Sequence, residues 1–100
     1  MGAIKDNHYT DKEFEIAHLF DAISHPARKR MIDLLSKYPF CRNTDLALAL
    51  NLSHTATMNH LNKLKRAKLV DIRYERHHYE VILDSKRFNT ITEYIDGLSG

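Results

Sequence analysis

The chain has 100 residues, of which 43% are hydrophobic, and a net charge of +2 at pH 7. This length fits one domain with a modest core, and the hydrophobic content is too high for a disordered chain. No apolar run approaches the roughly 18 residues of a membrane span, and no basic start precedes an apolar block at the N-terminus, so we expect neither a membrane contact nor a secretory signal. Cys41 is the single cysteine, which excludes an internal disulfide and fits a cytoplasmic protein.

Positive charge is concentrated in the middle of the chain. Residues 61–78 carry six Lys or Arg against two acids, whereas residues 1–21 carry two against five and residues 79–100 carry two against four. A basic centre between acidic ends is typical of a face that binds a polyanion. A solvated helix with scattered lysines has the same composition, so the charge favours a nucleic-acid-binding protein without deciding the matter.

Helical patterns follow a polar start. We expect residues 1–11 to form a flexible N-terminal segment and residues 12–100 to form a single domain. Apolar spacing predicts a first helix over residues 12–23. A second helix should begin at Pro26, where the missing N–H of proline is not needed, and end before Pro39. Its buried face should comprise Met31, Leu34, Leu35 and Tyr38.

A short helix, a tight turn and a capped helix come next. The short helix should be capped by Asn43 or Thr44, and its apolar side comprises Leu46, Ala49 and Leu50. Asn51 tolerates the left-handed conformation that ends many helices. Ser53 is a good N-cap for a helix over residues 54–68. Two helices joined in this way within about 25 residues indicate a helix-turn-helix.

The helix over residues 54–68 has two distinct faces. Helical spacing gives an inward stripe of Thr57, His60, Leu61 and Leu64. The opposite side comprises His54, Thr55, Met58, Asn59 and Asn62. This side has no carboxylate, whereas a solvated helix face usually includes Glu and Asp, so it suits contact with phosphates and bases. We expect His60, on the inward stripe, to be a hydrogen-bonded structural residue and not a base reader.

The apolar period changes from 3.6 to 2 in the last third of the chain. Alternation over residues 70–74 and 78–83, joined by residues 75–77, predicts a β-hairpin. A closing helix should be capped by Ser85, and its apolar stripe comprises Phe88, Ile91, Tyr94, Ile95 and Leu98. The stripes on the first and last helices exceed the needs of one small core, which favours a symmetric dimer. The fold class is therefore mostly α with a β-hairpin wing: a winged helix-turn-helix in the order helix, helix, helix-turn-helix, hairpin, helix.

The sequence resembles the ArsR/SmtB family of bacterial and archaeal repressors over about residues 15–98. The segments that carry the resemblance are LFDAISHPARKRMIDLL, DLALALNLSHTATMNHLNKLKRAKLV and YEVILD. The Asp-Pro-x-Arg start of the family corresponds to His25-Pro26-Ala27-Arg28, its recognition segment to residues 52–61 and its Ala-Gly-Leu-Val motif to residues 67–70. Met58 replaces a usual Ser or Thr, His54 replaces a common Gln, and the wing tip lacks the usual Gly, which implies an altered operator. The family pairs through its first and last helices.

The pattern and the resemblance together predict a sequence-specific repressor that binds an inverted-repeat operator on double-stranded DNA as a homodimer. The N-terminal half of helix 54–68 should enter the major groove. Base edges should be contacted by His54, Thr55, Asn59 and Asn62, and a thymine methyl by Met58. Phosphates should be bound by Lys63, Lys65 and Arg66 and, from the wing, by Arg73 and Arg76. Ser53, at the start of the helix, and His77, at the wing, complete the predicted DNA-binding residues.

Two metal sites are common in the family that the sequence resembles, and the chain lacks the ligands of both. Arg42 and Thr44 stand where one site has its Cys-x-Cys pair. At the other site only Asp84 remains. Its other positions hold Lys86, Gly97 and Gly100. Neither set could hold zinc, so we expect no metal and no cofactor.

Two alternatives stay open. His77 and His78 could bind a metal across a dimer with other histidines, which would make the protein a metal-responsive repressor; the candidates are His8, His18 and His25. Adjacent histidines on a strand point to opposite faces, which disfavours this reading. The second alternative is a winged helix used only for protein–protein contact. Such a protein would show no salt-dependent DNA binding.

Enzymatic and redox roles find little support. The sequence has no Gly-rich phosphate loop, no nucleophile with a base at useful spacing and no metal triad, so we expect no enzyme. Cys41 stands alone in an apolar context and is expected to be a buried, inert thiol.

Overall fold

The computed structural model describes residues 8–38 and 40–99. The predicted flexible segment, residues 1–11, lies mostly outside them. Within the described residues the chain forms α-helices and a small antiparallel sheet with strand order β1-β3-β2. The elements in chain order are α2 (Asp11–Ala22), α3 (Pro26–Lys37), β1 (Phe40–Arg42), α4 (Asn43–Leu50), α5 (His54–Arg66), β2 (Val70–Glu75), β3 (His78–Leu83), the 3-10 turn η1 (Ser85–Arg87) and α6 (Phe88–Ser99). The predicted winged helix-turn-helix order is confirmed; β1 and η1 were not predicted.

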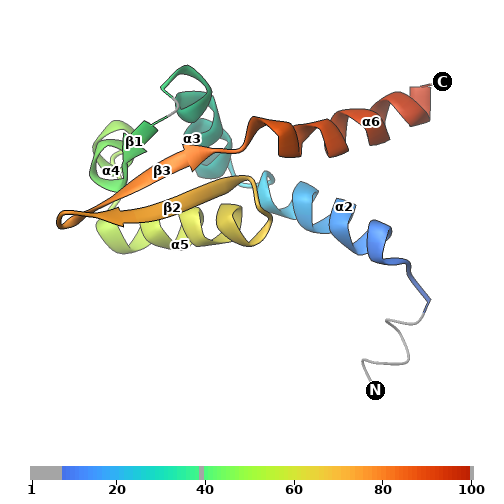
Figure 1. The fold of residues 1–100 in the computed structure, drawn as a ribbon, viewed down its shortest axis with the longest axis horizontal. Coiled ribbons are helices and arrows are strands. Elements are labelled where there is room, and N and C mark those ends of the chain that lie inside the picture. The colour runs from blue at the N-terminus through green and yellow to red at the C-terminus, as the bar shows by residue number, and fades with distance from the viewer. Residues whose placement is uncertain (1–7, 39, 100) are drawn as a thin grey trace.

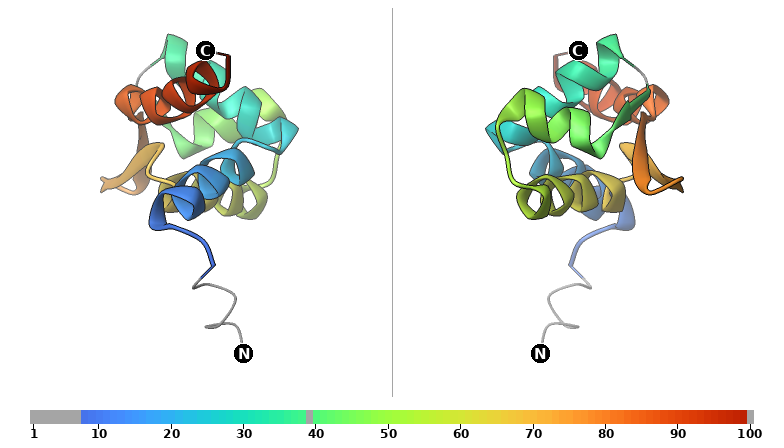
Figure 2. Two further views of the ribbon diagram at one scale, coloured as in Figure 1. Left: turned by 90° about the vertical axis from the view of Figure 1, so that its right-hand side faces the viewer. Right: turned by 90° about the vertical axis from the view of Figure 1, so that its left-hand side faces the viewer.

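The elements are distributed between two ends of the molecule. In Figure 1 the tip of the β2–β3 hairpin, α4 and the first turns of α5 lie at one end, and α2 and α6 extend toward the other. Seen from the wing end, α4 and α5 lie in front with the hairpin beside them, and α2 and α6 lie behind (Figure 2, right). The wing tip and the first turns of α5 therefore lie away from the far ends of α2 and α6, the predicted dimer helices.

The first two helices begin at side-chain caps. Thr10 and Glu13 form a capping box: the Thr10 hydroxyl accepts from the Glu13 N–H at 3.1 Å, and the Glu13 carboxylate accepts from the Thr10 N–H at 2.9 Å. Helix α2 consequently begins at Asp11, one residue before the predicted start. The α3 cap is His25, whose Nδ1 accepts from the Ala27 N–H at 3.0 Å.

The helix-turn-helix forms close to the predicted residues, but α5 ends at Arg66, two residues before the predicted end, and the cap of α4 differs. Asn51 adopts the left-handed conformation (φ 56°), and the Ser53 hydroxyl caps α5 by accepting from the Ala56 N–H at 3.1 Å. Neither Asn43 nor Thr44 caps α4. The helix begins at Asn43 itself, and the Asp45 carboxylate accepts from the Arg42 N–H at 3.2 Å. The Asn43 side chain is unavailable as a cap because it bonds to α5 and β3.

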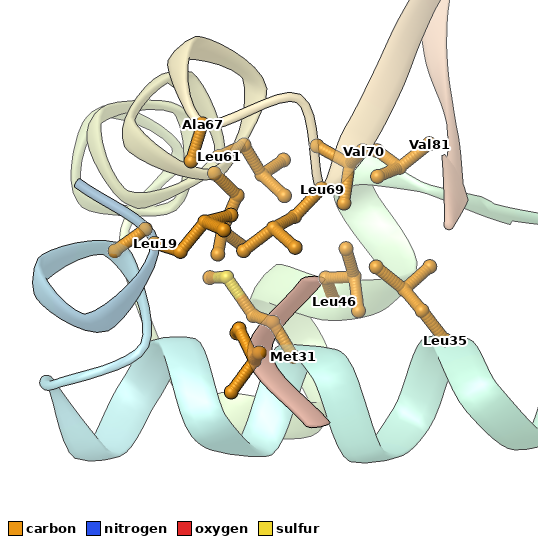
Figure 3. Packing of buried hydrophobic residues seen from close by; sticks show 12 residues of the cluster. Leu19, Met31, Leu35, Leu46, Leu61, Ala67, Leu69, Val70 and Val81 are labelled. Carbon is orange, nitrogen blue, oxygen red and sulfur yellow. The ribbon is translucent and has the colours of Figure 1, made fainter. Parts of the chain in front are cut away.

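One hydrophobic core joins the helices to the sheet. Figure 3 shows Leu19, Met31, Leu35, Leu46, Leu61, Leu69 and Val81 converging between α2, α3, α4, α5 and β3. The predicted burial of Tyr38 is wrong: it lies beyond the end of α3 and is 60% exposed. Ala49 is also exposed, so the buried side of α4 is centred on Leu46.

The wing is a tighter hairpin than predicted. Glu75 pairs with His78, which leaves a two-residue turn of Arg76 and His77. Both residues have positive φ, 39° and 72°, as a type I′ turn requires. Such turns usually contain Asn-Gly, so this wing tip holds two side chains in a conformation that disfavours them. The apolar face of the hairpin continues past the core to Tyr74 and Tyr79, whose rings make an edge contact at 5.1 Å.

The closing helix leaves most of its apolar stripe uncovered. Ser85 belongs to η1 and not to a cap of α6, so that prediction is wrong. Ile91 is buried in the core, whereas Ile95 and Leu98 are 45% and 71% exposed. Tyr94 makes an edge contact with Phe20 of α2 at 6.0 Å, which joins the exposed faces of the two helices. Among the described residues no helix is long and apolar enough to cross a membrane.

Candidate DNA-binding surface

Helix α5 has the two faces predicted from its sequence. Thr57, Leu61 and Leu64 are fully buried against the core. On the other side four predicted base-contacting residues are exposed: His54, Thr55, Asn59 and Asn62. The helix contains no acidic residue, and its last turn adds three exposed cations, Lys63, Lys65 and Arg66. The exposed side of α5 is therefore polar and free of acids along the helix, and it is positive in the last turn.

Met58 departs from the prediction. Helical spacing predicts that Met58 lies on the outer side, but it is half-buried and packs against the core. Residue 58 follows the buried Thr57 by one step of about 100°, so it lies at the boundary between the two faces. A long flexible thioether fills such a boundary position readily.

A hydrogen-bonded chain holds the first residue of α5. The buried amide of Asn43, 2% exposed, lies between the wing and His54. The Tyr79 N–H donates to Asn43 Oδ1 at 3.1 Å, and Asn43 Nδ2 lies 3.2 Å from His54 Nδ1. The imidazole of His54 is thereby fixed relative to α4 and β3. The sequence indicates only a capping role for Asn43, because nothing local reveals a partner 36 residues away.

The wing presents its charges unevenly. Arg76 and His77 are exposed at the tip. Arg73 lies 3.5 Å from the carboxylate of Asp71 and opposite Glu80 of β3, so its charge is partly offset. Tyr74, on the other face of β2, is 63% exposed and shares that face with Val70 and Ile72, which contact the core. Tyr74 is therefore a hydroxyl donor near the wing tip that the sequence analysis missed, although an aromatic residue in a wing strand could have indicated it.

His60 is a structural residue, as expected. Its Nδ1 lies 3.2 Å from the guanidinium of Arg28, and its ring lies 4.4 Å from that of His25. The buried Arg28 also donates to the carbonyl oxygen of Ala22, at 2.6 Å, at the end of α2. Burial lowers the pKa of His60, and the nearby charges of His25, Arg28 and Lys63 lower it further. Arg28 and His60 therefore connect α2 and α3 to the inner side of α5.

Cys41 is only partly buried. Its Sγ lies 3.3 Å from the carbonyl oxygen of Tyr38. Burial raises the pKa of the thiol, and the carboxylate of Asp45 raises it further, so the reactive thiolate is disfavoured. This agrees with the expected inert thiol, although the side chain is less enclosed than predicted.

Potential metal ligands are dispersed. In the described parts of the chain, no three His, Cys, Asp or Glu side chains cluster in a way that could hold a metal ion. His77 lies in the wing turn, whereas His78 lies on β3 with its Nε2 3.8 Å from the Glu80 carboxylate. The geometry within one chain therefore offers no support for the metal-responsive alternative.

The central part of the chain matches a known protein family. Residues 25–71, which span α3, α4 and α5, match the family model described as bacterial regulatory protein, arsR family. The matched segment, 47 of the 100 residues, is an ArsR-type helix-turn-helix. Proteins of the matched family are regulatory proteins, which supports a DNA-binding transcriptional regulator. The search of curated protein sequences gives no match.

Solved structures agree with this ArsR-type fold. NolR from Sinorhizobium fredii is 28% identical, with 86% of each chain covered and a TM-score of 0.68. HlyU from Vibrio cholerae is 23% identical over 90% of this chain and 97% of its own, with a TM-score of 0.72. Mb0332 from Mycobacterium bovis, described as a homodimeric winged helix-turn-helix DNA-binding domain and a possible ArsR-family regulator, is 18% identical over 91% of this chain and 87% of its own, with a TM-score of 0.70.

Proposed function

We propose that this ArsR-type regulator is a cytoplasmic repressor that binds an inverted-repeat operator as a homodimer. The observation that carries the proposal is the exposed side of α5, which has no acidic residue over 13 consecutive positions. Exposed surfaces of small proteins normally mix charges of both signs, and a face that approaches phosphates cannot carry carboxylates without repulsion.

The residues on this face divide into two roles. His54, Thr55 and Asn59 lie in the first half of α5, which in helix-turn-helix proteins contacts base edges in the major groove. The cations of the last turn and Arg76 at the wing tip would bind phosphates. Arg73 contributes less than the sequence suggested, because Asp71 and Glu80 lie beside it. Ser53 serves mainly as the cap that orients the helix, and Met58 mainly as a packing residue.

The dimer is proposed through α2 and α6. Phe20, Tyr94, Ile95 and Leu98 form an exposed apolar face on these helices. A second copy of the chain could cover this face around a two-fold axis. The recognition helices would then lie away from the axis, as an inverted repeat with half-sites about one helical turn apart requires. The relative Mb0332 is described as homodimeric.

The proposal is tested with the purified chain. Sequences selected from random duplex DNA should contain an inverted repeat, and binding measured by fluorescence anisotropy should weaken steeply with salt, because phosphate contacts release counterions. Light scattering should give twice the mass of the chain. A monomer that ignores duplex DNA at low salt would instead favour a protein–protein interaction module.

A further inference from the structure

The contact between Asn43 and His54 determines which ring nitrogen of His54 carries the proton. A backbone N–H can only donate, so the bond from the Tyr79 N–H at 3.1 Å assigns Asn43 Oδ1 to β3. The other amide atom, Nδ2, then faces His54 Nδ1 at 3.2 Å. An amide nitrogen also can only donate, so Nδ1 of His54 must be the acceptor. The proton of the neutral ring is consequently on Nε2.

We propose that Asn43 holds His54 in the Nε2–H form and thereby makes His54 a hydrogen-bond donor that favours guanine over cytosine in the operator. This inference rests on the proposed function, since it requires the first residue of α5 to face the major groove. Asn43 acts as a positioning residue and does not touch the DNA itself, because it is 2% exposed.

The donor form restricts which base His54 can read. Guanine presents two acceptors in the major groove, N7 and O6, whereas cytosine presents only the N4 amino donor. Adenine and thymine each present one acceptor, N7 beside an amino group and O4 beside a methyl group. An imidazole that could adopt either tautomer would bind both guanine and cytosine, because its exposed nitrogen could either donate an N–H or accept with a lone pair. Because Nδ1 is already bonded to Asn43, His54 offers the groove only its Nε2–H. Guanine is the preferred base at this position because it offers two acceptors and no amino group there, and cytosine is rejected because its amino group would face an N–H.

The tautomer is tested first in the free protein. Long-range proton–nitrogen NMR of the wild-type chain should show His54 protonated at Nε2 with a lone pair on Nδ1. Asn43→Asp replaces the amide donor by an acceptor of the same shape, so at pH about 8.5, where an imidazole beside a carboxylate is mostly neutral, the proton should move to Nδ1. An Nδ1–H ring in the wild type would overturn the inference. The wild-type spectrum decides this even if Asn43→Asp fails to fold.

The base preference is tested by operator selection. Wild-type protein should prefer guanine over cytosine by about tenfold at one symmetric pair of positions. His54→Ala should lose that preference alone, and Asn43→Asp at the same alkaline pH should shift it toward cytosine or adenine, which present amino donors. The control His18→Ala removes an exposed imidazole from α2 and should retain every preference.

The failures of the two proposals are distinguishable. A wild-type chain without duplex binding would contradict the proposed function. Specific binding that His54→Ala leaves unchanged at every position would overturn only the inference about His54. The selected guanine can be replaced by 7-deazaguanine, which lacks N7, or by 2-aminopurine, which lacks O6. At least one of these replacements should weaken DNA binding by the wild-type protein without weakening DNA binding by His54→Ala. Neutral methylphosphonates at the neighbouring phosphates test a backbone contact instead. If only these replacements affect the wild-type protein and His54→Ala differently, His54 contacts the backbone and the inference that it reads a base is wrong.

Discussion

The guanidinium of Arg28 donates to Nδ1 of His60 at 3.2 Å, which joins the start of α3 to the inner side of the recognition helix. The same guanidinium donates to the carbonyl oxygen of Ala22 at 2.6 Å. A cation near the C-terminus of α2 is also favoured by the helix dipole. The buried side chain of Arg28 therefore links a proposed dimer helix, α2, to the proposed DNA-reading helix, α5. The hydrogen bond from Arg28 to His60 requires Nδ1 of His60 to be unprotonated.

The stability of the protein should fall in mild acid because of His60. Its pKa in the folded chain lies below the ordinary value of 6.5. The unfolded chain therefore takes up the proton first, and the contribution of His60 to stability is complete above about pH 6.5 and is lost as the pH falls through the folded pKa. His60→Asn keeps an acceptor for Arg28 and should flatten this part of the curve. Urea unfolding across pH 5 to 7 measures the effect; identical pH profiles for both proteins would contradict it.

Arg76 should bind phosphate without reading sequence. Arg76→Gln keeps a long polar side chain at the wing tip and removes the charge. We expect weaker binding to all duplexes and a salt slope reduced by about one for each protomer. Anisotropy titrations at several salt concentrations check this. Arg73→Gln is the comparison, with a smaller change expected because Asp71 already lies 3.5 Å from Arg73.

Asn59 should read a base. Asn59→Ala removes an exposed amide from the middle of α5, and an asparagine amide pairs well with adenine. We expect a loss of about 1–3 kcal/mol of discrimination at one operator position and little change in the salt slope. Selection from random duplexes measures the preference. A sequence preference that survives intact would show that this face of α5 does not lie in the groove.

The exposed end of α6 should be needed for pairing. Leu98→Glu places a charge where burial of the leucine would contribute about 1.5–3 kcal/mol in each protomer. The expected result is a monomer by light scattering and weakened operator binding. Leu48→Glu is the control for the oligomeric state, since Leu48 is 82% exposed on α4, at the other end of the molecule, and this variant should remain a dimer. Dimers that persist in Leu98→Glu would place the interface elsewhere.

Relief of the wing turn should stabilise the protein. His77 has a φ of 72°, which glycine adopts without a steric penalty. His77→Gly should raise the free energy of unfolding by about 0.5–1 kcal/mol, less than the full penalty because glycine gains entropy in the unfolded chain. Chemical denaturation measures the change. His78→Gly, one residue later in β3, should instead destabilise the strand.

Local signals in the sequence were sufficient for the order of the elements and for the two faces of α5. The turn at Asn51, the cap at Ser53 and the start of α3 at Pro26 depend on interactions within a few residues, and periodicity separates Thr57 and Leu61 from the exposed polar side. The two-residue wing turn was mispredicted by one residue, because alternation alone does not reveal whether Glu75 pairs with a partner strand.

The tertiary structure decided which side chains meet. Asn43 and Tyr79 are 36 residues apart, and Arg28 and His60 are 32 apart, so no local pattern could pair them. Met58 is half-buried because neighbouring elements reach the boundary of α5, which periodicity leaves undecided. Spacing along the chain determines the direction in which a residue points on its own helix or strand. Its partners are decided only when separate elements pack together, because hydrogen bonds and desolvation depend on atoms from distant parts of the sequence.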